Sequence, residues 1–314
     1  MRHKYKILLI GYSNIARKRL IKTFIKKKIP FCVATKSFKK KVKGSYQQFN
    51  DYDMALRYSG ADIVYLSLPN SMHFRWSKKI LKSGFHLIVD KPITTKIDQL
   101  NYLISIAKRK KLLLTEATYF NYHRQFEVIQ RFIGKLSNIE QVFVNFTIPM
   151  PKKNSLLLSR KFSGGAFMDM SPYTSSINRL LFKERLEKKS IIVKKNIKKL
   201  ITSYDVFLKY KTKVLNGTFR FGKNYNNNIL IYLKNKSIEA NRVFSPPDNT
   251  NLEVQITKHN RTKTIHINQD NCFENYFLEV IKNIKKKRYT FYLNRMIKDE
   301  NFRFKLLNSY SKIN

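Results

Sequence analysis

Apolar residues in the first part of the chain follow two alternating patterns. Short continuous apolar runs are typical of strands buried on both faces, and spacings of three or four residues are typical of helices. The runs predict strands at residues 6–10, 31–34, 63–67, 86–89 and 112–115, and the wider spacings predict helices around residues 15–27, 52–58, 72–83 and 97–108. This order predicts a parallel sheet with helices on both faces.

From about residue 137, runs in which every second residue is apolar dominate. Such runs occupy residues 142–148, 191–195, 206–210, 216–221, 229–233, 252–256 and 264–267. They predict a mostly antiparallel sheet with one packed face. Helical spacing returns at residues 167–182, 273–286 and 293–310. We therefore predict an α/β protein with two domains, residues 1–120 and 121–314.

Composition narrows the class of protein. The 314 residues are 43% hydrophobic, which is enough for two separate cores. No apolar run approaches the roughly 18 residues of a membrane span, and the start of the sequence does not resemble a secretory signal. Two cysteines, Cys32 and Cys272, are too few for a disulfide framework or a thiolate zinc site. We expect a cytoplasmic protein with no metal and no membrane partner.

The net charge is extreme, at +43. Such a charge favours acidic partners such as nucleic acids or phosphorylated molecules. The lysines are nevertheless spread along the whole chain, and no nucleic-acid-binding motif accompanies them. We expect mostly solvated surfaces and no nucleic-acid partner, with a basic nucleic-acid binder as an alternative.

The first predicted strand leads into a dinucleotide-binding fingerprint. Gly11, Ser13 and Ala16 occupy the three small-residue positions of this motif, in which the start of a helix faces a pyrophosphate. Ser13 departs from the usual second glycine, although its hydroxyl could donate to a phosphate. We take Gly11, Ser13, Asn14, Ile15 and Ala16 as candidate cofactor-binding residues.

The second strand ends at Thr35, Lys36 and Ser37, without the acidic residue that usually accepts from the ribose of NAD. Hydroxyls and a cation suit a 2′-phosphate, so NADP(H) is favoured and NAD(H) is the alternative. Lys36 could also belong to the general basic surface.

Two later strands end in polar loops at the edge of the sheet where ligands bind. The first loop contains Leu68, Pro69, Asn70 and His73, and the second contains Asp90, Lys91 and Pro92. Asn70 could contact the nicotinamide ribose, and Lys91 would bring an ammonium group into the same crevice. His73 could instead be a packing residue, and Lys91 could merely end a strand.

A carboxylate and a phenol are four residues apart in the helix that follows Gly164-Gly165. Asp169 and Tyr173 therefore share one helix face and could form a proton-transfer pair. A free tyrosine has a pKa near 10, so proton transfer at neutral pH needs a nearby cation, which Lys91 would supply. Read alone, the pair is also compatible with an ordinary helix face.

Together these motifs resemble the Gfo/Idh/MocA oxidoreductases over nearly the whole chain. The resemblance rests on the Gly11 fingerprint, Pro69-Asn70, Asp90-Lys91-Pro92, Glu116-Ala117, and Gly164-Gly165 with Asp169 and Tyr173. It implies an N-terminal Rossmann domain and a C-terminal α/β domain with a large open sheet, often used for oligomer contacts. A homodimer or homotetramer is the assembly that it implies.

The resemblance also implies roles for individual residues. Lys91 would contact the reacting oxygen, Asp169 would orient the substrate, and Tyr173 would be the acid/base. Asp90 replaces the usual glutamate of the lysine motif. Glu116 is assigned to the cofactor site, and Arg160 and His123 to the substrate site; His123 is equally compatible with packing.

These expectations converge on an NADP(H)-dependent oxidoreductase that acts on a sugar or polyol. A nucleotide-linked sugar would suit the basic surface. The alternative is a cofactor-binding regulator or scaffold of the same fold, for which Ser13 in the glycine loop is the main support.

Overall fold

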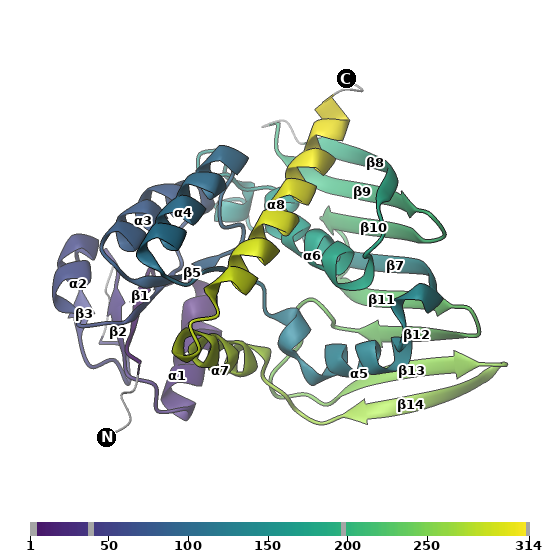
Figure 1. Cartoon of the computed structure of the whole chain (residues 1–314), viewed down its shortest axis with the longest axis horizontal. Coiled ribbons are helices and arrows are strands. Elements are labelled where there is room, and N and C mark those ends of the chain that lie inside the picture. The colour runs from purple at the N-terminus through teal and green to yellow at the C-terminus, as the bar shows by residue number, and fades with distance from the viewer. Residues whose placement is uncertain (1–4, 37–40, 196–198, 312–314) are drawn as a thin grey trace. The chain divides into compact units, whose positions relative to one another are not determined.

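The computed structural model describes residues 5–36, 41–195 and 199–311, and the chain forms two compact units (Figure 1). The first unit comprises Met1–Ala117 and Tyr276–Ile297, and the second comprises Thr118–Asn275 and Lys298–Asn314. The domains expected from the sequence were each one continuous stretch. The return of Tyr276–Ile297 to the first unit was not anticipated.

The first unit is built on a six-stranded sheet. Its strands are β1 (Ile7–Ile10), β2 (Phe31–Ala34), β3 (Gln48–Phe49), β4 (Ile63–Leu66), β5 (His86–Asp90) and β6 (Leu114–Ala117). All neighbours pair in parallel, in the order β3-β2-β1-β4-β5-β6. This order is that of a Rossmann sheet, and it confirms the predicted parallel sheet. The two-residue strand β3 was not predicted.

Helices cover both faces of this sheet. They are a π-helical turn η1 (Ala16–Leu20) with α1 (Ile21–Lys26), α2 (Tyr52–Tyr58), α3 (Asn70–Lys82), α4 (Ile97–Lys110), most of α7 (Cys272–Lys285) and the start of α8 (Tyr289–Ser311). One core joins α2, α3 and α4 to alternate strand residues such as Leu8 and Val64. On the other face, Phe277 of α7 packs against Phe24 of α1 and Tyr65 of β4.

The second unit is built on an eight-stranded sheet. Its strands are β7 (Ile139–Ile148), β8 (Leu186–Lys195), β9 (Ile201–Tyr210), β10 (Val214–Phe221), β11 (Asn226–Leu233), β12 (Lys236–Asn241), β13 (Leu252–Lys258) and β14 (Arg261–Ile267). Their order is β14-β13-β12-β11-β7-β10-β9-β8, and β7 and β10 are the parallel pair. The other pairs are antiparallel, which confirms the predicted mostly antiparallel sheet.

Helices pack against one face of this second sheet. The helical segments of the unit are α5 (Arg124–Ile133), α6 (Ala166–Leu181), the end of α8, and the short turns η2 (Phe120–Tyr122), η3 (Leu136–Asn138) and η4 (Leu156–Leu158). Helix α5 lies along β12 and β13, and α6 lies along β9 and β10 (Figure 1). The sheet also carries exposed apolar side chains, with Ile192 70% exposed and Tyr232 43% exposed. One packed face was predicted; helix α5 was not.

Over the described part of the chain, we find no helix that combines the length and the hydropathy needed to cross a membrane.

Candidate active site

Gly11 forms the turn at which β1 ends. Its φ is +96°, a conformation that L residues rarely adopt. A Cβ at this position would lie 2.1 Å from the carbonyl oxygen of Ser67, at the end of β4. Glycine therefore allows β1 to turn directly beside the neighbouring strand, as the dinucleotide fingerprint requires.

Ser13 takes part in two hydrogen bonds near the first helix. Its Oγ accepts from the backbone N–H of Ala16 at 3.1 Å and shares a 2.7 Å hydrogen bond with Oγ of Ser67. The serine therefore satisfies a backbone donor at the helix start and links this loop to β4. Ala16 is fully buried, whereas Asn14 and Ile15 are exposed.

Two of the candidate cofactor residues at the end of β2, Thr35 and Lys36, lie in the described part of the chain. Thr35 is buried, and Lys36 is exposed, with its ammonium 5.8 Å from the ring centroid of Tyr52. Ser37 lies outside the described residues. Asp51, the next acidic residue along the chain, caps α2 instead. The backbone N–H of Met54 holds the pKa of this carboxyl below its usual range, and the charge of Lys36 acts in the same direction.

Asp90 is held by two hydroxyl groups from β4 and its loop. Its carboxylate accepts from the hydroxyl of Tyr65 and from Oγ of Ser67. Burial raises the pKa of Asp90, and these hydroxyl groups and the charges of His73 and Lys91 oppose that rise. With Ser13, these residues form a hydrogen-bonded chain across the ends of β1, β4 and β5.

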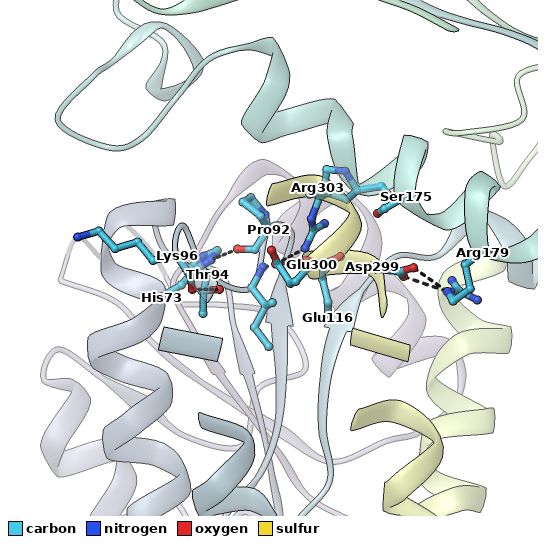
Figure 2. Close-up of polar contacts among 12 residues, drawn as sticks. His73, Pro92, Thr94, Lys96, Glu116, Ser175, Arg179, Asp299, Glu300 and Arg303 are labelled. Carbon is cyan, nitrogen blue, oxygen red and sulfur yellow. Dashed lines mark hydrogen bonds and ion pairs between the residues drawn. The ribbon is translucent and has the colours of Figure 1, made fainter. Parts of the chain in front are cut away.

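Side chains also hold the main chain of the two residues that follow Lys91. The carbonyl oxygen of Pro92 lies 2.7 Å from Nδ1 of His73 (Figure 2). The N–H of Ile93 donates to Oε2 of Glu116 at 2.8 Å. The Lys91-Pro92 peptide bond is cis, and Lys91 itself is half-buried. The backbone around this lysine is thus anchored before and after it by side chains.

The loop after β4 approaches the same edge of the first sheet. Asn70 begins α3 after Pro69, and the carbonyl oxygen of Leu68 lies 2.8 Å from Nε2 of His73. His73 is fully buried, and its two ring nitrogens both lie beside main-chain carbonyls. Glu116 is 6% exposed and bonds to the main chain. Direct contact of His73 or Glu116 with a cofactor stays a prediction.

In the second unit, Gly164 and Gly165 shape the start of α6. A Cβ on Gly164 would lie 2.5 Å from the carbonyl oxygen of Leu157, and Gly165 has a φ of +108°. The N–H of Asp169 donates to the carbonyl of Gly165 at 3.0 Å, in the first helical turn. Asp169 and Tyr173 are both partly exposed, whereas Met170 and the next two residues are buried.

Three phenylalanines surround the ring of Tyr173. The centroid distances are 6.0 Å to Phe120, 5.3 Å to Phe146 and 5.4 Å to Phe244. These rings come from η2, β7 and the loop after β12. They restrict the orientation of the phenol. This aromatic cage was not predicted, because its members are far apart along the chain.

Tyr204 is a second phenol near this region of α6. It is fully buried, and its hydroxyl lies 3.1 Å from Oγ1 of Thr174. Burial raises the pKa of Tyr204 well above its usual value; the hydroxyl of Thr174 and the charge of Arg303 oppose the rise, and the charge of Asp169 adds to it. Tyr204 therefore stays protonated at neutral pH.

Helix α8 contributes buried ion pairs to the second unit. Asp299 pairs with Arg179 of α6 at 2.8 Å, and Glu300 pairs with Arg303 (Figure 2). Such pairs are costly to break, because the remaining charge would be left buried. Within the described ranges, no cluster of three or more His, Cys, Asp and Glu residues is arranged to bind a metal ion.

The two other substrate candidates lie in different settings. His123 is 1% exposed, and its Nδ1 accepts from the N–H of Gln125 at 3.1 Å, so it caps α5. Arg160 is exposed in the loop before α6. Substrate contacts by either residue stay a prediction. Lys91 belongs to the first unit, and Asp169 and Tyr173 belong to the second. That these three side chains act on one substrate also stays a prediction.

The known proteins to which this chain is similar are oxidoreductases. Residues 5–118 match a family model described as the GFO/IDH/MocA oxidoreductase family with an NAD-binding Rossmann fold. A dTDP-3,4-didehydro-2,6-dideoxy-alpha-D-glucose 3-reductase of Streptomyces violaceoruber is 24% identical over 198 residues, which cover 60% of this chain and 58% of that protein. A D-xylose 1-dehydrogenase (NADP(+)) of Haloferax volcanii is 25% identical over 134 residues, covering 42% and 41% of the two chains. The matched regions thus span less than two thirds of these relatives.

Solved structures extend the similarity of fold to the whole chain. A 3-ketoreductase from Actinomadura kijaniata, in complex with NADP and TDP-benzene, has a TM-score of 0.91 and 19% identity, and the match covers 98% of both chains. Other structures of that enzyme carry a replaced tyrosine or a replaced lysine.

Proposed function

Because the chain belongs to the Gfo/Idh/MocA oxidoreductase family, we propose that it is an NADP(H)-dependent oxidoreductase of sugars or polyols. A nucleotide-linked keto sugar is the substrate class that the named relatives favour. The observation that carries the proposal is the anchoring of Lys91 at the ligand-binding edge of a Rossmann sheet, by Asp90, His73 and Glu116.

The first unit has features that fit NADP(H). The Gly11 turn leaves no side chain where the backbone must approach a pyrophosphate, and Lys36 offers a cation where NAD-binding sites usually carry a carboxylate. When bound, NADPH supplies a hydride at its nicotinamide ring. The residues that we assign to its binding are Gly11, Ser13, Asn14, Ile15, Ala16, Thr35, Lys36, Ser37, Leu68, Pro69, Asn70, His73, Asp90, Lys91, Pro92 and Glu116. NAD(H) is the alternative cofactor.

Three side chains would handle the substrate. Tyr173 would donate the proton to the substrate oxygen during reduction and remove it during oxidation. The ammonium of Lys91 would polarise the same oxygen and stabilise the phenolate. Asp169 would orient a substrate hydroxyl. The aromatic cage supports this assignment, because a phenol of restricted motion loses little freedom when it is oriented for proton transfer.

A direct test measures NADPH consumption with TDP-linked keto sugars and with free sugars of matched structure. We expect turnover with at least one carbohydrate ketone, and faster turnover when the sugar carries the nucleotide. Turnover with free sugars alone would remove the nucleotide sugar from the proposal. NADPH binding without turnover of any carbohydrate would instead support a regulator or scaffold.

The cofactor preference has its own test in Lys36→Ala. Loss of this cation should weaken NADPH binding about tenfold, because a charge-assisted bond to the 2′-phosphate is lost, and should leave NADH binding unchanged. Lys22→Ala removes the same charge from an exposed position on α1 and serves as the control. Fluorescence titration with both cofactors measures the effect. Equal losses for NADPH and NADH would contradict a 2′-phosphate contact.

We also infer a cytoplasmic location and a homodimeric or homotetrameric assembly. Neither Cys32 nor Cys272 forms a disulfide, which suits a reducing compartment. The exposed apolar side chains of the second sheet, among them Ile192 and Tyr232, offer a surface for a second copy.

A further inference from the structure

His73 is a fully buried histidine with a carbonyl oxygen beside each ring nitrogen. Nδ1 lies 2.7 Å from the oxygen of Pro92, and Nε2 lies 2.8 Å from the oxygen of Leu68. Carbonyl oxygens only accept hydrogen bonds, so each nitrogen must donate. A neutral imidazole carries one N–H, and its other nitrogen would direct a lone pair at a carbonyl oxygen. An imidazolium carries both donors.

Two other histidines of the chain show the opposite arrangement. Nδ1 of His86 accepts from the N–H of Leu113 at 3.0 Å, and Nδ1 of His123 accepts from the N–H of Gln125 at 3.1 Å. An acceptor nitrogen carries no proton, so both rings are neutral. Burial lowers the pKa of His86, which favours the same state. The double-donor geometry is thus particular to His73 among these three residues.

We propose that His73 is a buried imidazolium that ties the end of β4 to the end of β5, and that it positions both loops for NADP(H). Leu68 precedes Pro69-Asn70, and Pro92 follows Lys91, so one ring holds two loops that we assign to the cofactor site. The proposed charge state of His73 rests on the geometry of the two carbonyls. Its effect on the cofactor rests on the proposed function.

The charges around His73 can accommodate a cation. Asp90, at the end of β5, interacts electrostatically with both His73 and Lys91. Burial raises the pKa of Asp90, and the two hydroxyl groups that donate to its carboxylate oppose that rise. Glu116 of β6 holds the next turn of the β5 loop. Lys96 belongs to the same region, but its ammonium points away from His73 (Figure 2). A carboxylate at Asp90 would compensate the charge of the imidazolium.

Nitrogen NMR of the histidine rings tests the charge state directly. In protein labelled with ¹⁵N-histidine, at a pH of about 7.5, we expect two protonated ring nitrogens for His73 and one for His86. An ordinary histidine, with a pKa of about 6.5, is mostly neutral at that pH. His73→Gln and His86→Gln assign the two sets of signals. A neutral His73 ring would overturn the proposal, whatever cofactor the protein binds.

NADPH titration over a range of pH tests the positioning role. The amide of His73→Gln can reach only one of the two carbonyls, so we expect NADPH binding about tenfold weaker than that of the unaltered protein. Binding to the unaltered protein should weaken above the pH at which NMR shows the proton leaving His73. The variant should lack that step, and His86→Gln should retain it.

The possible failures are distinguishable. Unchanged NADPH affinity and pH dependence in His73→Gln would overturn the positioning role, even with an imidazolium seen by NMR. Absence of NADPH binding by the unaltered protein would overturn the proposed function, while the NMR spectrum would still decide the charge of His73.

Discussion

Lys91→Ala should lower turnover at least ~10²-fold while NADPH binding stays detectable. The ammonium group would act on the reacting oxygen, so its loss should affect the chemical step more than cofactor binding. The backbone of this loop should persist, because Asp90, His73 and Glu116 anchor it through groups that the substitution leaves in place. Steady-state kinetics and NADPH titration measure the two effects separately.

Tyr173→Phe should cause a loss of similar size, since only the phenolic hydroxyl is removed and the ring remains among Phe120, Phe146 and Phe244. If Lys91 and Tyr173 serve one proton transfer, the double variant should be little slower than either single variant. Lys96→Ala and Tyr58→Phe, at exposed positions, are the matched controls. Normal turnover in both active-site variants would remove these two residues from the mechanism. Fully multiplicative losses would mean that they act independently.

Gly11→Ala should have the largest effect on stability. The new Cβ would lie 2.1 Å from the carbonyl oxygen of Ser67 and 2.7 Å from its carbon, in a backbone conformation with φ of +96°. Backbone cannot yield as a flexible side chain can, so the ends of β1 and β4 would have to separate. We expect a loss of about 3 kcal/mol or more in the free energy of unfolding, together with loss of NADPH binding.

Gly60→Ala is the control that separates the steric clash of a new Cβ from the strain of a positive φ. Gly60 also has a positive φ, of +56°, but no atom lies within 4 Å of the position that a Cβ would take there. This variant should lose only about 1 kcal/mol, the usual cost of a positive φ for alanine. Urea unfolding of both variants measures the difference. Equal losses would show that strain, rather than collision with Ser67, dominates at Gly11.

Much of the first unit could be predicted because its local signals agree with one another. The strand Phe31–Ala34 and the helix Tyr52–Tyr58 have the predicted bounds. All four residues of β2 are buried, so the strand reads as a continuous apolar run, and Asp51 marks the start of α2 as its N-cap. The apolar pattern fixes the bounds of the strand, and the N-cap residue fixes the start of the helix.

The missed elements have physical explanations. Strand β3 has two residues, and β12 (Lys236–Asn241) is mostly polar, so neither gives a clear apolar pattern. Helix α5 did carry a signal: Phe126, Ile129 and Ile133 are buried at helical spacing, and His123 caps its first turn. Histidine is not among the usual N-cap residues, and this start was overlooked.

Sequence motifs single out Lys91, Asp169 and Tyr173, and their roles stay predictions. The hydrogen-bond network around Lys91 could not be predicted. The anchoring of Asp90 by Tyr65 and Ser67 depends on the register of β4 and β5, which pattern alone does not fix. The two carbonyls beside His73 likewise come from segments that meet only in the fold.

The return of Tyr276–Ile297 to the first unit has a consequence for the order in which the protein is made. On the ribosome, the six parallel strands emerge first, but Phe277, which packs against Phe24 and Tyr65, emerges only after all strands of the second sheet. Until then one face of the nascent sheet lacks part of its cover, and aromatic surface is open to water or to chaperones. The first unit can therefore complete its core only after the strands of the second sheet have been translated.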